Sequence, residues 1–201
     1  KNFRNKINFN NSGSLEAQIS AISDDIAYNN HDIQDGIKAE MFNLNDLIEI
    51  NFFKDIYKSH KNNIKNNNKD ILIYQIIRDS IDLMVRDLIK NTKNNLKINK
   101  IKSLNNVHQL EDPIVCFSSK FLDIEKEVRF FLRSKMYNNK KVLSKNNQGK
   151  KIVNKLFSKI KNKPKKFISN DLLKMDENRA IADFISGMTD RYAINLHKSI
   201  R

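Results

Sequence analysis

Long stretches of this sequence repeat apolar residues every three or four positions, which is the spacing of one face of an α-helix. Residues 70–94 show the pattern most clearly. Their apolar positions are Ile73, Ile76, Ile77, Ile81, Met84, Val85 and Leu88. No stretch sustains the alternation of apolar and polar residues that is typical of a half-buried strand, and only 4 Gly and 2 Pro interrupt the 201 residues. The sequence therefore predicts an all-α fold.

We expect a polar loop at 61–69, a less regular connection at 97–119, and a helix end at Pro164. Gly187 falls inside the last expected helix, where it costs about 1 kcal/mol relative to Ala. We interpret this glycine as allowing close helix packing. The expected helices cover residues 15–35, 40–59, 70–94, 120–138, 147–162 and 177–199.

Composition limits the compartment and the partners. No run of 18 apolar residues occurs, so we expect no membrane span. The first residues, KNFRNKINFNN, lack the apolar core of a signal peptide. The single cysteine, Cys116, fits a reducing, cytoplasmic setting, excludes a cysteine-based zinc site and is interpreted as a small core residue.

The net charge of +14 raises the question of a polyanionic partner. Lys, Asn and Ile are used heavily throughout, so we interpret most of this charge as spread over a solvated surface. Nucleic acid stays open as a partner. The basic segment 150–166 is amphipathic, and we expect its apolar side to pack on the domain rather than on anionic lipid.

The segment 14–36, SLEAQISAISDDIAYNNHDIQDG, has two different faces when it is drawn as a helix. Its apolar face consists of Leu15, Ile19, Ile22, Ile26 and Ile33. Within about 80° of Asp24 on the opposite side lie Tyr28, His31, Asp32 and Asp35, and Asp25 lies at about 100°. No Lys occurs from 7 to 37. This face is either a metal or acid–base site or an acidic solvated stripe.

Two phrases of the sequence resemble one family of enzymes. EAQISAISDDIAYNNHDIQD at 16–35 and NRAIADFISGMTDRYAINLHK at 178–198 resemble helices of the deoxynucleotide triphosphohydrolases, the dGTPase-like branch of the HD-domain phosphohydrolases. Between them, PIVCFSSKF and EVRFFLRSKMYNNKKV resemble the connecting helices in order and spacing. The resemblance covers essentially the whole chain. It implies an HD-domain-type helical bundle, with the end of the HD domain at 1–62 and phosphohydrolase-associated helices at 63–201.

The same resemblance implies a reaction and a set of site residues. Members of the family cut a deoxynucleoside triphosphate, here with dGTP as the first choice, to deoxynucleoside and triphosphate with Mg²⁺ or Mn²⁺. Asp24 corresponds to the last metal ligand, and Asp25 is the alternative ligand. Tyr28 and Asp32 correspond to positions that face the deoxyribose, Asp32 near its 3′-hydroxyl. Arg78 either reaches substrate phosphate or pairs with a neighbouring Asp.

One departure from the family pattern is large. The first His and the His-Asp pair of the family's metal site lie upstream of this helix, and residues 1–13 contain no His. His60 and His108 are interpreted as surface residues. We therefore expect the C-terminal portion of such an enzyme, without assigned catalytic residues, inactive without its N-terminal part, and a homo-oligomer by resemblance. The alternative is a non-catalytic helical module that binds nucleic acid or regulates.

Overall fold

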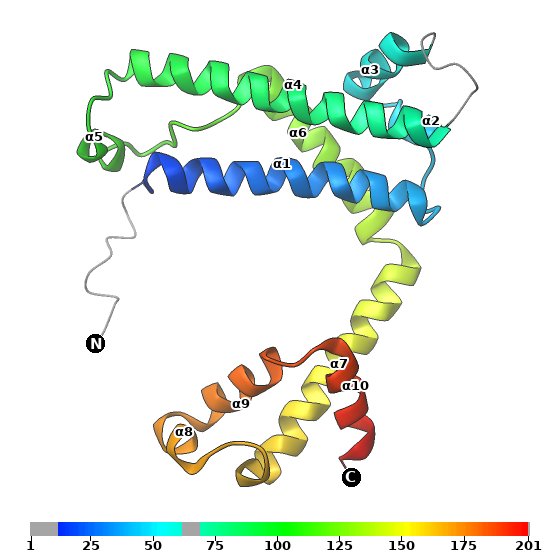
Figure 1. The fold of residues 1–201 in the computed structure, drawn as a ribbon, viewed down its shortest axis with the longest axis vertical. Coiled ribbons are helices and arrows are strands. Elements are labelled where there is room, and N and C mark those ends of the chain that lie inside the picture. The colour runs from blue at the N-terminus through cyan, green and yellow to red at the C-terminus, as the bar shows by residue number, and fades with distance from the viewer. Residues whose placement is uncertain (1–11, 62–68, 201) are drawn as a thin grey trace. The chain divides into compact units, whose positions relative to one another are not determined.

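The computed structural model describes residues 12–61 and 69–200. These residues form ten α-helices, a π-helical segment and a short 3-10 helix, without a strand among them (Figure 1). The predicted all-α fold is therefore confirmed. Most of the predicted loop at 61–69 lies outside the described residues. No helix in the described ranges is long and apolar enough to cross a membrane.

The chain divides into two compact units, residues 1–137 and 138–201. In the first unit, α1 lies beside α4, and α3 and α6 pack against this pair (Figure 1). The boundary predicted between residues 62 and 63 separates the end of the HD domain from the phosphohydrolase-associated helices. It differs from the division between the two compact units at 137 and 138. The helices of the first unit are α1 (Leu15–Lys38), α2 (Leu44–Leu47), α3 (Asn51–Lys61), α4 (Lys69–Ile98), α5 (Leu104–His108), α6 (Ser119–Leu132) and the π-helical η2 (Arg133–Tyr137).

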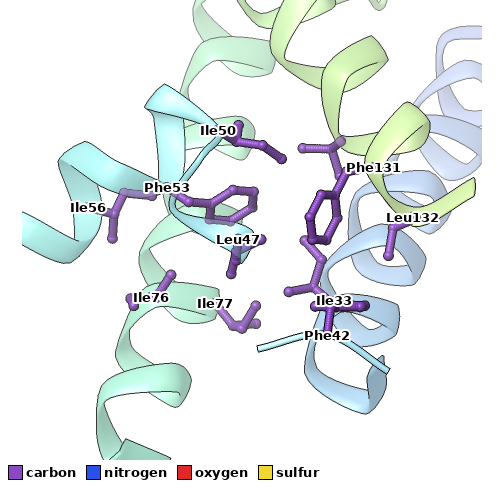
Figure 2. Close-up of a cluster of buried hydrophobic side chains, with 11 residues drawn as sticks. Ile33, Phe42, Leu47, Ile50, Phe53, Ile56, Ile76, Ile77, Phe131 and Leu132 are labelled. Carbon is purple, nitrogen blue, oxygen red and sulfur yellow. The ribbon is translucent and has the colours of Figure 1, made fainter. Parts of the chain in front are cut away.

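Aromatic rings fill the centre of the first unit. Phe53 of α3 is fully buried, and Phe131 of α6 meets Phe42 edge to face with ring centroids 4.8 Å apart. Figure 2 shows these side chains converging from α1, α3, α4 and α6. A second cluster joins Ile26 of α1 to Met84 of α4. The two clusters fix α1 on α4 and α6 and thereby fix which face of α1 stays free.

The second unit has its own core. Leu156 and Ile160 of α7 are fully buried against Ile181 and Ile185 of α9. The basic segment 150–166 thus packs Leu156 and Ile160 on the domain, as its sequence predicts, while Val153 stays 46% exposed. The elements of this unit are α7 (Lys140–Asn162), the 3-10 helix η3 (Pro164–Lys166), α8 (Asn170–Met175), α9 (Glu177–Ser186) and α10 (Asp190–Ser199).

Two expected helices are each divided in two. The range 40–59 contains α2 and α3, because Asn43 begins α2 with a capping box and the chain turns again before α3. The range 177–199 contains α9 and α10, because Gly187 ends α9 and the hydroxyl of Thr189 accepts the Tyr192 N–H at 3.3 Å. The close packing expected at Gly187 is wrong, since this residue is exposed.

Candidate active-site face

The acidic face of α1 lies on the side opposite its buried residues. Ile26, Asn30 and Ile33 face α4 and the core. The apolar side is less completely buried than its pattern predicts, since Ile19 stays 47% exposed. On the other side, Asp32 is half-buried. The exposed residues of this face are Asp24, Asp25, Tyr28, His31 and Asp35.

An arginine from α6 reaches this face. The Arg129 guanidinium forms an ion pair with Asp25, Nη2 to Oδ2, at 2.9 Å, and a second with Glu125 of its own helix. Residues 7–37 contain no Lys, so the positive charge beside the carboxylates comes from a helix more than 100 positions away in the sequence. The face therefore combines carboxylates from α1 with a guanidinium from α6.

A tyrosine from the segment after α6 holds Asp32. The hydroxyl of Tyr137 donates a hydrogen bond to Oδ2 of Asp32. Burial raises the pKa of Tyr137 well above its usual range, and the bond to Asp32 raises it further because an ionised phenol would face a carboxylate. Tyr137 is therefore a fixed, neutral donor at one oxygen of Asp32, while the other oxygen has no hydrogen-bond partner among the described residues.

Two side chains of the π-helical segment η2, Lys135 and Tyr137, contact other helices of the first unit. Short π-helical segments next to α-helices are rare and frequently lie at functional sites. From η2, Lys135 forms an ion pair with Asp46 at 2.9 Å, which anchors the segment to α2. The pKa of Asp46 is lowered, first by the backbone N–H of Asn43 and then by Lys135. Through this anchor and Tyr137, η2 is attached to both α2 and α1.

Asp24 has no partner among the described residues, in contrast to Asp25 and Asp32. It is exposed, and no described side chain forms an ion pair or hydrogen bond with its carboxylate. Among residues 12–61 and 69–200, no group of three or more His, Cys, Asp or Glu could hold a metal ion. The described residues alone therefore do not form a cation site, and Asp24 offers at most a single oxygen ligand.

The remaining predicted residues lie elsewhere. Arg78 is exposed on α4 and is joined to none of the α1 residues by a hydrogen bond or ion pair in the described part of the chain. Its expected partners are otherwise engaged: Asp79 contacts Nε2 of His60 at 2.5 Å, and Asp82 pairs with Arg86. Neither interpretation of Arg78 is decided by these contacts.

Both histidines that were expected at the surface are half-buried and hydrogen-bonded. His60 joins α3 to α4 through Asp79. The Nδ1 atom of His108 lies 2.6 Å from the carbonyl oxygen of Ser12. The surface interpretation of these two residues is therefore wrong, because each connects segments that are distant in sequence and the pattern around a single His carries no sign of such a contact.

Sequence reasoning missed Arg129 and Tyr137. A signal was present, because Arg129, Arg133 and Tyr137 follow one another at intervals of four and so share one side of a helix. The spacing alone does not indicate that this side faces the carboxylates of α1. The π-helical turn is not visible in the sequence pattern.

Comparison with known proteins places the chain. Residues 115–199 match a family model described as a phosphohydrolase-associated domain. A deoxyguanosinetriphosphate triphosphohydrolase-like protein of Pelagibacter ubique is 88% identical over 200 residues, which cover 100% of this chain and 54% of that protein. Proteins of the same name from Bartonella henselae and Rickettsia typhi are 35% and 33% identical, over 99% of this chain and 51% and 53% of their own lengths.

The chain spans about half the length of the curated relatives it matches. The resemblance seen in two phrases of the sequence thus extends over nearly all of its residues. Over essentially its whole length, this chain is therefore similar to about half of the length of the deoxyguanosinetriphosphate triphosphohydrolase-like proteins.

Proposed function

We propose that this chain is the C-terminal portion of a metal-dependent dNTP triphosphohydrolase, which converts a dNTP and water to a deoxynucleoside and triphosphate. dGTP is the first substrate to test, since it is named in the relatives' own names. The observation that carries the proposal is the unequal engagement of the α1 carboxylates. Asp25 and Asp32 are held by α6 and η2, whereas Asp24 is exposed and unpaired.

This difference favours Asp24 over Asp25 as the metal ligand. A divalent cation such as Mg²⁺ or Mn²⁺ prefers carboxylate oxygens without a competing positive charge. Asp25 already has the Arg129 guanidinium at 2.9 Å. Asp24 would supply one ligand, and the others would come from a His and a His-Asp pair in the part of the enzyme outside this chain. A cation bound there would polarise substrate phosphate and lower the pKa of a bound water.

Asp32 and Tyr28 suit a deoxyribose pocket. Because Tyr137 occupies Oδ2 of Asp32, the Oδ1 atom stays open to accept a hydrogen bond from a sugar hydroxyl. Tyr28 lies one helical turn before Asp32 and is 59% exposed. A carboxylate fixed by a neutral donor keeps its orientation as substrate binds and leaves, which favours selection of the 3′-hydroxyl.

Arg129 supplies a positive charge beside the carboxylates, where residues 7–37 contain no Lys. The resemblance implies that the position of Asp25 is held by a phosphate-binding Lys in animal relatives, and a carboxylate cannot bind phosphate in that way. Arg129 places a guanidinium beside Asp25, and guanidinium groups bind phosphate oxygens through paired donors. We propose Arg129 as a phosphate ligand, with Arg78 as a second, weaker candidate. A cytoplasmic homo-oligomer is the accompanying proposal for the assembled enzyme.

A chimera tests this function. Residues 1–201 would replace the matching segment of the Pelagibacter ubique relative, whose remaining half supplies the rest of the enzyme. Triphosphate release from each dNTP would be measured with Mg²⁺ and with Mn²⁺. We expect release by the chimera and none by the 201-residue chain alone, since one carboxylate cannot bind a hard cation at useful affinity.

Variants of the chimera assign the roles. Asp24→Ala should abolish metal binding and activity together, whereas Asp32→Ala should retain the metal and raise KM. Asp35→Ala is the matched control, because Asp35 is an exposed carboxylate of the same helix face with no assigned role. Loss of the metal in Asp25→Ala but not in Asp24→Ala would reverse the ligand assignment. If neither variant lost it, the face would be a solvated acidic stripe.

A further inference from the structure

Most of the net positive charge of the chain lies in the second unit. Residues 138–201 hold 16 of the 37 Lys and Arg residues but only 5 of the 23 acidic residues. Their net charge is therefore +11, which leaves +3 for residues 1–137. The even spread expected from composition is wrong.

The charge of α7 is not neutralised by neighbouring acids. No Asp or Glu occurs from 128 to 170. Helix α7 contains eight Lys and no Arg, and none of these lysines pairs with an acidic side chain of the described residues. In the first unit, by contrast, cations such as Arg86, Arg129 and Lys135 are paired with carboxylates. Unpaired like charges along one helix repel each other and favour a polyanionic partner.

The lysines share their surface with uncharged hydrogen-bonding groups. Lys140, Lys151 and Lys155 lie within about 60° of one another on the side of α7 opposite the buried Leu156. Two shallow hollows lie along α7, and each contains two lysines. The first is lined by Lys140, Leu143, Ser144, Asn147, Gln148 and Lys151. The second is lined by Asn154, Lys155, Ser158, Lys159 and His197.

The chemistry of this surface separates nucleic acid from lipid. An amphipathic helix binds a bilayer by inserting its apolar side, but the central apolar residues of α7, Leu156 and Ile160, are already buried against α9. Lys, Ser, Asn and Gln side chains are the groups that contact phosphate and sugar in nucleic-acid complexes. The absence of Arg from α7 removes the forked donor that most often reads guanine.

We propose that the outer side of α7 binds the phosphodiester backbone of nucleic acid without reading its sequence. This site is separate from the acidic face of α1 and does not depend on the proposed enzymatic function. The binding should be electrostatic, with a dissociation constant of about 10⁻⁴ to 10⁻⁶ M near physiological salt and a steep salt dependence.

The test uses the purified 201-residue chain. Fluorescence anisotropy with a labelled single-stranded DNA of about 30 nucleotides would be measured over roughly 50 to 300 mM NaCl. The triple variant K140Q/K151Q/K155Q should bind at least about tenfold more weakly at the lowest salt, with a salt slope reduced by about 2, since three phosphate contacts are lost. The triple variant K140R/K151R/K155R should keep both the affinity and the slope.

The matched control removes the same charge elsewhere. K54Q/K90Q/K93Q replaces three exposed lysines of the first unit and should leave the affinity within about twofold, apart from the small long-range charge term. Equal weakening by both Gln triples would overturn the proposal, because net charge alone would then explain binding. Absence of binding at the lowest salt would overturn it as well.

Two further arms identify the ligand. Affinity should rise with oligonucleotide length and be similar for DNA and RNA of mixed sequence, which a pocket for a single nucleotide triphosphate would not show. Vesicles of phosphatidylserine and phosphatidylcholine should compete weakly. Vesicle binding that is tighter than DNA binding, and lost in the K140Q/K151Q/K155Q variant, would reassign the surface to anionic lipid and overturn the proposal.

Discussion

The hydrogen bond from the Tyr137 hydroxyl to Asp32 joins η2 to the candidate site. Both residues are half-buried, so this bond is less exposed to competing water than the ion pair between Arg129 and Asp25. Removing this donor would leave the half-buried Asp32 carboxylate without a hydrogen bond from any described residue. The bond therefore contributes to stability as well as to the orientation of Asp32.

Tyr137→Phe should lower the free energy of unfolding at pH 7 by roughly 1–2 kcal/mol, toward the lower end of the range for a hydrogen bond to a charged group, because the site keeps some solvent access. Urea denaturation followed by circular dichroism measures this change. Tyr192→Phe is the control, because Tyr192 is 51% exposed and its hydroxyl has no hydrogen bond in the described structure. A Tyr137→Phe chain as stable as the parent would mean that the bond is not formed in solution.

The same residue predicts an alkaline pH dependence. The pKa of Tyr137 is raised above the value of about 10 expected in the unfolded chain. Its stabilising contribution is thus complete below about pH 10 and is lost as the pH rises from there through the raised folded-state pKa. The unfolding free energy of the parent chain should therefore fall more steeply above pH 10 than that of Tyr137→Phe. Parallel curves would contradict this assignment.

Among the four glycines, only Gly36 lies where an added Cβ would clash with another side chain. A Cβ at this buried position of α1 would overlap the Phe42 ring, and Phe42 is itself fixed against Phe131. Gly36→Ala should destabilise the chain by about 1–3 kcal/mol through overpacking. Gly149 is exposed within α7 with open space around it, so Gly149→Ala should stabilise by up to about 1 kcal/mol. Thermal unfolding compares the two; a neutral Gly36→Ala would mean that Phe42 can move aside.

The sequence predicts those features of the site that depend on residues close together in the chain, but not those that depend on contacts between distant helices. The carboxylates of α1 follow from local periodicity, because residues four apart share a helix face regardless of the rest of the fold. The contacts of Asp25 with Arg129 and Asp32 with Tyr137 depend on how α6 crosses α1 and on a π-helical turn. No local pattern encodes those two features, so the partners were missed.

At the scale of elements, the presence of a helix was easier to predict than the residues at which it begins and ends. The expected range 70–94 and the observed α4 agree to within a few residues, because its apolar stripe is continuous. The expected range 177–199 also has helical spacing throughout, yet the chain breaks it at SGMTD. Gly187 ends α9, and Thr189 satisfies a backbone N–H at the start of α10. These capping interactions outweigh the apolar pattern.

Thr189→Ala should therefore weaken α10 specifically. The loss of an N-cap hydroxyl costs about 1 kcal/mol, and α10 has no fully buried residue to compensate. Hydrogen exchange should become faster over residues 190–199 and stay unchanged in α4. Thr189→Ser retains the capping oxygen and should exchange like the parent chain. If α9 and α10 accelerated together, the two would form one cooperative element in spite of the break.

At the scale of the whole molecule, the two units differ in core and in charge. The first has two clusters of buried side chains built from α1, α3, α4 and α6, and the second has one cluster built mainly from α7 and α9. No buried residue of the first unit's clusters belongs to the cluster of the second unit. The net charge of +11 on residues 138–201 adds internal repulsion to the smaller core, which lowers its stability at low salt. The second unit should therefore be the more salt-dependent of the two.

Core substitutions in each unit test whether they unfold separately. Leu156 and Phe53 are both fully buried, one in each unit. Leu156→Ala should cost about 2–5 kcal/mol and Phe53→Ala about 3–5 kcal/mol, through lost transfer free energy and the cavity left behind. Hydrogen exchange should then accelerate in α7 and α9 for Leu156→Ala, and in α1, α3 and α4 for Phe53→Ala. Added NaCl should slow exchange in α7 and α9 more than in α4, because salt screens the lysine repulsion. Acceleration of both units by either substitution would show that the 201 residues unfold as one cooperative body.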